Sequence, residues 1–178
     1  NIVPSPYLTG ALDQYFQLPL IPMIETTRGC PFTCTFCADG LAIKSKINRY
    51  ETQRTREELQ YIAKNINKVD ELIVTDLNFG MYKQDMETAK EIASIQKNYN
   101  YPVSVDAPAG KNMPKRIINI ASIMKGWSMG GVIQSSDPGV LKAIKRSNIS
   151  IHAYQDLIDF GNKQKANRTY TEIILGLP

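Results

Sequence analysis

Short apolar runs alternate along the chain with longer amphipathic stretches, as they do when strands are followed by helices. Runs rich in Val, Ile and Leu predict five strands, over residues 23–26, 71–76, 102–106, 131–135 and 170–175. Apolar residues at helical spacing predict five intervening helices, over 55–66, 83–98, 114–125, 138–146 and 152–166. This alternation is typical of a parallel sheet covered by helices, so we expect an α/β fold.

Several helix boundaries carry their own sequence signals. Thr55 and Glu58 have the spacing of a capping box and predict the start of the first helix. Pro114 suits the first position of the third helix. Asp137 and Pro138 suit the N-cap and first position of the fourth.

The three cysteines of the chain fall within one short loop after the first predicted strand. They are Cys30, Cys34 and Cys37, with the spacing C-x3-C-x2-C. Three thiolates on one loop can ligate three irons of a cubic iron–sulfur cluster and leave the remaining iron without a protein ligand. A cluster that only transfers electrons normally has all its irons ligated by protein. The loop therefore indicates a site where a substrate or cosubstrate binds the open iron.

A structural zinc site is the main alternative. Such sites usually take four Cys or His ligands in paired spacings. The only histidine, His152, has no ligand-spaced partner and is more than a hundred residues from the cysteines. A disulfide framework is disfavoured by the odd number and crowding of the cysteines. A non-catalytic zinc or scaffold domain remains the rival to an iron–sulfur enzyme.

The cysteine loop resembles the cluster loop of the radical S-adenosylmethionine (SAM) superfamily, in which an aromatic residue, here Phe36, precedes the last cysteine. The resemblance implies a [4Fe-4S] cluster on the three cysteines, with SAM chelating the open iron. It implies reductive cleavage of SAM to a 5′-deoxyadenosyl radical, with electrons from a donor such as flavodoxin or ferredoxin. The fold it implies is a partial (β/α)6 parallel barrel over residues 21–178, incomplete after about its fifth strand.

The resemblance also implies that groups at the strand ends hold SAM. After the second strand, Asp76 or Asn78 would accept from the methionine ammonium, in place of the Gly-Gly-Glu of many members. Asp76 as a cap of the following turn is the alternative. Gln134 resembles a residue near the SAM ribose and carboxylate, with a buried structural hydrogen bond as its alternative. Gly176 resembles the strand backbone beside adenine. Two residues are weaker candidates: Asp106 for contact with SAM or substrate, and Arg146 for contact with the SAM carboxylate.

One subgroup of the superfamily gives the best resemblance. Residues 4–10 resemble the linker that joins an N-terminal cobalamin-binding domain to the barrel, and the Asn78-Phe79 pair supports the same placement. We therefore expect residues 1–20 to be a linker outside the barrel and cobalamin to bind a separate domain. Methyl transfer is then an alternative to hydrogen abstraction. The residues do not specify the substrate.

The composition argues against nucleic acid and membrane as binding partners. The chain has 178 residues, 43% of them hydrophobic, enough for one domain with its own core. Lys and Arg number 21 against 17 Asp and Glu, and the net charge of +4 is too small and dispersed to indicate nucleic-acid binding. No apolar run approaches the roughly 18 residues that span a membrane. Unpaired thiols and an oxygen-sensitive cluster suit the cytoplasm. The first residue is not Met and the last strand runs into a turn, so we expect a piece of a longer protein.

Overall fold

Parallel strands in chain order form the centre of the protein, for which a computed structural model describes residues 3–163 and 169–178. Strands β1 (Met23–Ile24), β4 (Glu71–Val74) and β5 (Ser104–Asp106) are hydrogen-bonded neighbours and run parallel. A parallel bridge between Val105 and Trp127 extends this order to β6 (Met129–Gly130), which pairs in parallel with β7 (Thr169–Tyr170). The predicted α/β fold with a parallel sheet is confirmed. No pairing closes the array into a barrel in the part of the chain that the structure describes.

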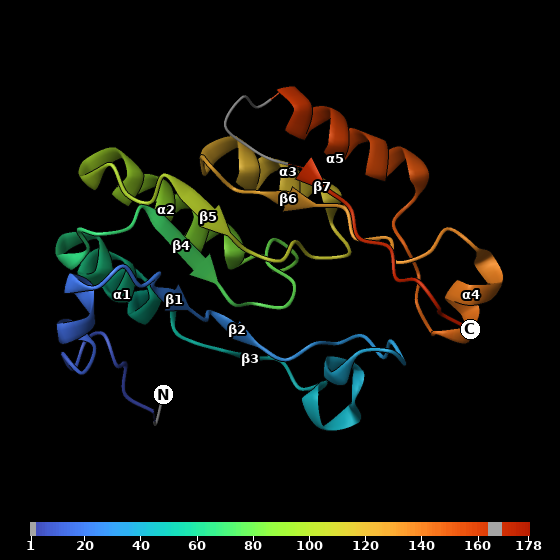
Figure 1. Ribbon diagram of the computed structural model, residues 1–178, viewed down its shortest axis with the longest axis horizontal. Coiled ribbons are helices and arrows are strands. Elements are labelled where there is room, and N and C mark those ends of the chain that lie inside the picture. The colour runs from blue at the N-terminus through green and yellow to red at the C-terminus, as the bar shows by residue number, and fades with distance from the viewer. Residues whose placement is uncertain (1–2, 164–168) are drawn as a thin grey trace.

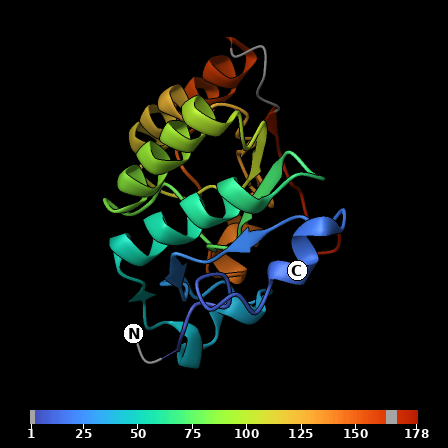
Figure 2. The same ribbon diagram turned by 90° about the vertical axis from the view of Figure 1, so that its left-hand side faces the viewer.

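Helices lie along one face of this strand array (Figures 1 and 2). They are α1 (Thr52–Asn65), α2 (Asp85–Tyr99), α3 (Pro114–Ile123) and α5 (Ile151–Lys163). The short α4 (Pro138–Ala143) lies apart from them, near the C-terminus (Figure 1). A two-stranded antiparallel ribbon, β2 (Thr27–Arg28) with β3 (Asn48–Arg49), extends on the side away from the helices (Figure 1). That side is where the cysteine loop lies.

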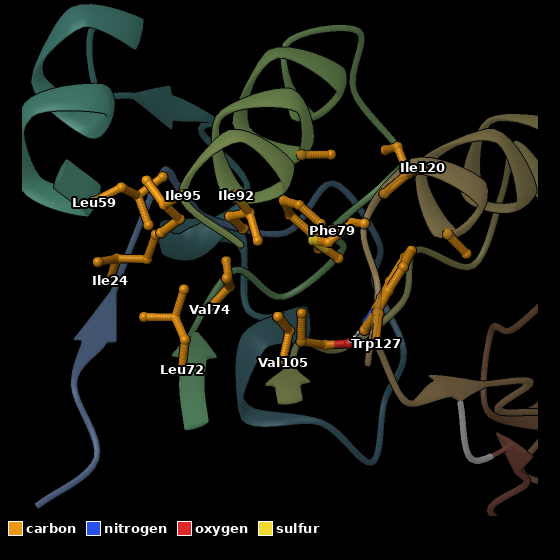
Figure 3. Close-up of a cluster of buried hydrophobic side chains, with 14 of the residues drawn as sticks. Ile24, Leu59, Leu72, Val74, Phe79, Ile92, Ile95, Val105, Ile120 and Trp127 are labelled. Carbon is orange, nitrogen blue, oxygen red and sulfur yellow. Dashed lines mark hydrogen bonds between the residues drawn. The ribbon is translucent and has the colours of Figure 1, made fainter. Parts of the chain in front are cut away.

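The core fills the space between the strands and the helices (Figure 3). Leu72, Val74 and Val105 of the strands are at most 1% exposed, because alternate strand residues point toward the helices. Phe79 and Trp127 meet edge to face with ring centroids 5.4 Å apart. The Trp127 indole N–H donates to the Ala107 carbonyl at 2.9 Å, so this large residue is buried without an unpaired donor. The helices contribute buried residues that include Leu59, Ile62, Ile92, Ile95 and Ile120.

Residues before β1 pack against the sheet and α1. The Tyr7 hydroxyl donates to the Met23 carbonyl at 2.8 Å and accepts from the Met23 N–H at 3.0 Å. Phe16, in the 3-10 helix η1 (Asp13–Gln17), is buried between the rings of Tyr7 and Tyr61. The division into a linker over 1–20 and a core domain over 21–178 stays a prediction.

Several element boundaries differ from the prediction. The strands are shorter than predicted, and β7 (Thr169–Tyr170) overlaps only the start of the predicted fifth strand at 170–175. Helix α1 begins at Thr52, so Thr55 lies inside it and is not its cap. The Glu58 carboxylate instead accepts from the Arg54 guanidinium one turn earlier, at 2.9 Å. The fourth strand lies at Met129–Gly130 rather than 131–135, because buried Trp127 brings the chain beside β5 earlier. Helix α4 stops at Ala143, before the predicted end at 146.

Other boundary predictions are confirmed. Asp137 is the N-cap of α4, where its carboxylate accepts from the Val140 N–H at 2.9 Å, and Pro138 is the first helical residue. Pro114 likewise opens α3. The predicted fifth helix overlaps α5 as far as Lys163, and residues 164–166 of that prediction lie outside the described residues.

Among residues 3–163 and 169–178, no helix is long and apolar enough to cross a membrane.

Candidate functional site

The cysteines lie in the loop that connects β2 to β3, rather than directly after β1 as the sequence pattern predicts. Cys30 follows β2, and its N–H donates to the Lys44 carbonyl across the loop at 3.0 Å. The Cys37 N–H donates to the Cys34 carbonyl at 3.2 Å, which brings these two residues into one turn. The Thr35 N–H donates to the Ile144 carbonyl at 3.1 Å and ties the loop to the end of α4.

Gly29 makes the path of this loop possible. Its φ is +107°, in a region that residues with a Cβ rarely adopt. A Cβ at this position would lie 2.3 Å from the Lys46 carbonyl oxygen of the opposite side of the loop. The predicted need for glycine before Cys30 is therefore confirmed by both the backbone angle and the close approach.

The three thiols are free, and two of them are held by side chains from the strand ends. Cys30 and Cys34 are buried and Cys37 is half-buried. The Asn78 amide donates to the Cys30 sulfur at 3.5 Å, and the Lys111 ammonium donates to the Cys34 sulfur at 3.1 Å. Within the described ranges, no group of three or more His, Cys, Asp or Glu side chains is arranged around a single metal ion.

Asp76 and Asn78 lie side by side in sequence at the end of β4 but differ in their partners. Both Asp76 oxygens are occupied: they accept from the Thr26 N–H at 2.6 Å and from the Thr26 hydroxyl at 2.5 Å. Burial raises the pKa of Asp76, and the hydrogen bonds from Thr26 and Thr27 oppose that rise. Asn78 is 3% exposed, and its amide oxygen has no hydrogen-bond partner among the described residues.

This contrast separates a residue with structural partners from one with an unused acceptor. Asp76 fixes the backbone bend between β1 and β2, from which the cysteine loop departs. It does not cap the turn that follows it. Asn78 presents an unsatisfied buried acceptor beside Cys30, which is an unfavourable arrangement unless a donor arrives.

Gln134 is the second predicted residue with an unsatisfied buried acceptor. It is 6% exposed, its side-chain oxygen has no partner among the described residues, and its φ is +62°. Its backbone bonds on both sides to the segment after β7, since its N–H donates to Glu172 and its carbonyl accepts from Ile174, each at 2.9 Å. A non-glycine residue held in this conformation with an unused side-chain oxygen is a candidate for ligand contact.

The other predicted residues lie in more ordinary surroundings. Gly176 has φ +77°, and a Cβ there would meet nothing within 4 Å, so its surroundings are open. Phe36 is 37% exposed on the cysteine loop, and Asp106 is exposed at the end of β5. Arg146 is buried and follows α4 rather than lying on it. Its guanidinium donates to the Val132 carbonyl and to Asn148, so it braces the segment before Gln134.

Two buried groups near the site were missed by the sequence reasoning. Asp85, in the first turn of α2, accepts from the Gly80 and Tyr82 N–H groups at 2.7 and 2.9 Å. Burial raises the pKa of Asp85 to about 6. The Tyr82 hydroxyl is buried with no partner in the described ranges, and the Arg49 guanidinium lies 4.3 Å from its ring centroid. The sequence signal for Asp85 is an acidic residue at the start of an amphipathic helix.

The donor set suits an iron–sulfur cluster that carries an added ligand. The loop offers three soft thiol ligands, two of them buried, at one end of the parallel strands. Asn78 and Gln134 offer unsatisfied acceptors from two strand ends, as an ammonium- or hydroxyl-bearing ligand requires. These observations fit the predicted combination of cluster and SAM.

Comparison with known proteins defines the class. The model of the radical SAM superfamily matches residues 24–177, which is most of the chain. The chain therefore belongs to the radical SAM superfamily, a family of enzymes whose members use a [4Fe-4S] cluster and SAM.

The sequence relatives narrow the comparison. The chain is 34% identical over 187 residues to the cobalamin-dependent radical SAM methyltransferase TokK of Streptomyces tokunonensis, an alignment that covers 98% of this chain and 27% of TokK. It is equally similar, over the same shares, to the 2-(S-pantetheinyl)-carbapenam-3-carboxylate methyltransferase of Streptantibioticus cattleyicolor. The chain spans about a quarter of the length of these curated relatives.

Solved structures support the fold. The radical SAM methyltransferase TsrM of Kitasatospora setae, solved with cobalamin and a [4Fe-4S] cluster, matches with a TM-score of 0.69 at 14% identity, over 93% of this chain and 33% of that one. The cobalamin-dependent SAM radical enzyme OxsB matches with a TM-score of 0.61 at 17% identity, over 92% of this chain and 25% of that one. At these identities the likeness concerns the fold alone.

Proposed function

We propose that this chain is the SAM-cleaving core of a cobalamin-dependent radical SAM methyltransferase. The observation that carries the proposal is the contact of a loop of three free cysteines with Asn78, whose buried side-chain oxygen has no partner among the described residues. Gln134, beyond β6, offers a second buried acceptor of this kind. The 34% identity to two methyltransferases over nearly the whole chain supports the reaction class.

In this proposal each residue of the site has one task. Cys30, Cys34 and Cys37 ligate three irons and leave the last one open. Asn78 accepts from the SAM ammonium with the amide oxygen that otherwise has no partner. Gln134 does the same for a SAM ribose hydroxyl. Phe36 shields the cluster from water beside the last cysteine, and the backbone at Gly176 lies along the adenine.

Asp76 has a supporting task rather than a direct one. By accepting both donors of Thr26 it holds the start of the β2–β3 ribbon, and hence the cysteine loop, at a fixed place relative to β4. SAM binding by Asp76 would require it to release Thr26, so Asn78 is the better of the two candidates.

The cofactors supply the chemistry that side chains cannot. When bound, the cluster would supply the electron for reductive cleavage of SAM to a radical, and cobalamin in a separate domain would carry the methyl group. The protein core binds and orients SAM and keeps water away. We further propose that the strand array is the first part of a (β/α)6 partial barrel, and that a flavodoxin- or ferredoxin-like donor supplies electrons in the cytoplasm.

Anaerobic reconstitution tests the proposal. With iron and sulfide added, the chain should bind about four irons and four sulfides, as a [4Fe-4S] cluster requires. Cys30→Ala, Cys34→Ala and Cys37→Ala should each lose stable cluster binding, whereas His152→Ala serves as a matched control and should load fully. One zinc per chain with no iron, or iron that survives replacement of all three cysteines, would overturn the assignment.

A further inference from the structure

Lys111 reaches the cysteine loop from a different strand end. Its ammonium nitrogen lies 3.1 Å from the Cys34 sulfur and 4.6 Å from the centroid of the Phe32 ring. The side chain is half-buried and belongs to the connection between β5 and α3. One cation therefore contacts both a predicted iron ligand and an aromatic ring of the same loop.

The backbone that carries Lys111 is fixed close to Asn78. The Gly110 N–H donates to the Phe79 carbonyl at 2.8 Å, and the Phe79 N–H donates to the Pro108 carbonyl at 2.9 Å. Phe79 is fully buried, so this pairing is anchored in the core. Consequently Asn78 and Lys111 approach the cysteine loop from adjoining segments, one at Cys30 and the other at Cys34.

The electrostatic partners of Lys111 differ from those of two other basic residues on the ribbon and its loop. Arg28 donates to the Glu25 carboxylate, and Lys44 donates to the Asp39 carboxylate at 2.8 Å. Their charges are largely balanced by those carboxylates. The contacts of Lys111 are a sulfur and a ring face, so its charge acts on the thiol. Hydrogen bonds to the ligand sulfurs and nearby charge are two of the factors that set the reduction potential of an iron–sulfur cluster.

We propose that Lys111 is a positioning residue for the cluster: its ammonium holds Cys34 as an iron ligand and makes the cluster easier to reduce. The proposal rests on the proposed function, because it needs the cluster on the three cysteines. Reduction adds negative charge to the cluster, and a fixed cation hydrogen-bonded to a ligand sulfur stabilises the reduced form more than the oxidised form. Phe32 keeps the ammonium in place through the face of its ring.

A redox titration of the reconstituted chain, followed by the electron paramagnetic resonance (EPR) signal of the reduced cluster, tests this. Lys111→Met keeps the length of the side chain and removes its charge. Lys111→Arg keeps the charge. Lys125→Met is the matched control, since it removes the same charge from an exposed residue just before the strand segment at Trp127, at the opposite end of the strands from the cysteines.

A hydrogen bond to a charged group is worth enough to change an equilibrium about tenfold. At the ambient potential where the wild-type cluster is half reduced, Lys111→Met should therefore lower the ratio of reduced to oxidised cluster about tenfold. Lys111→Arg and Lys125→Met should stay within about threefold of wild type, which is well under the value of one such bond.

Each outcome has a definite reading. Failure of Lys111→Met to load the cluster, while Lys111→Arg and Lys125→Met load it, would also support the proposal, because charge beside Cys34 is then required for ligation. A wild-type potential in Lys111→Met would overturn it. So would a Lys111→Arg variant that behaves like Lys111→Met, since side-chain shape rather than charge would then matter. If the wild-type chain itself binds no iron, the proposed function fails, and that result is distinct from these.

Discussion

Replacing Asp76 by Ala should destabilise the fold, whereas replacing Asn78 should weaken SAM binding. The Asp76 carboxylate accepts two hydrogen bonds from Thr26, and both donors would be left buried without it. Two bonds to a charged acceptor contribute about 3–6 kcal/mol together. Loss of a buried carboxylate returns part of its desolvation cost, which is also why burial raises its pKa. We therefore expect Asp76→Ala to lower the free energy of unfolding by about 2–4 kcal/mol.

Asn78→Ala is the matched comparison, because it removes a polar side chain two residues away at the same strand end. Its amide makes one long contact to the Cys30 sulfur, and its oxygen has no partner in the described ranges. Removal of the side chain should therefore change the free energy of unfolding little. We expect a loss under about 1 kcal/mol. Urea unfolding of both variants under reducing conditions gives the stabilities, and calorimetric titration of the reconstituted proteins gives SAM affinity. An Asp76→Ala chain that is as stable as wild type but no longer binds SAM would refute the division of roles.

Three further predictions concern the loop, a buried acid and the second acceptor. Gly29→Ala should cost about 2 kcal/mol of stability and reduce cluster loading, because φ is +107° and the new Cβ would meet the Lys46 carbonyl; wild-type loading would contradict this. Burial raises the pKa of Asp85 from 3.8 to about 6, so the folded chain binds more protons than the unfolded chain in that interval. Stability should fall by about 2 kcal/mol as the pH rises from about 4 to about 6. Urea unfolding at several pH values in this range should show that the free energy of unfolding of Asp85→Asn depends less steeply on pH than that of wild type. An equally steep dependence would argue against the raised pKa of Asp85. Gln134→Ala should weaken SAM binding about tenfold, the value of one hydrogen bond to a buried partner, with the cluster retained; unchanged affinity in the same calorimetric titration would assign the residue a structural role.

Much of the fold follows from local patterns. The apolar runs at β1, β4 and β5 mark strands with one buried face, and the prolines at 114 and 138 mark helix starts, because each signal depends on residues close in sequence. The Thr55–Glu58 spacing was misleading because the residues just before it are also compatible with helix, and the Arg54–Glu58 pair stabilises the earlier turn. The position of β6 depends on Trp127 docking beside Val105, a contact between separate elements that no local pattern contains.

In the site, too, local sequence patterns predict some features, and contacts between distant segments determine the others. The cysteine spacing alone predicts the candidate cluster ligands, because all three lie close together in sequence. The assignment of Asp76 to Thr26, fifty residues earlier, and of Lys111 to Cys34 depends on how the chain folds back on itself. The sequence leaves open whether Asp76 or Asn78 contacts SAM. The answer depends on which side-chain oxygens already accept hydrogen bonds within the fold, and those of Asp76 do. The left-handed conformation of Gln134 is likewise imposed by pairing with the segment after β7.

The central claim is that three cysteines leave one iron open and that SAM occupies it. Electron–nuclear double resonance on the reduced, reconstituted chain with SAM labelled by nitrogen-15 at its amino group tests this directly. We expect a hyperfine coupling from the labelled nitrogen to the cluster that is absent with unlabelled SAM and is weakened in Asn78→Ala. A fully loaded cluster that shows no such coupling when SAM is present in excess would contradict it.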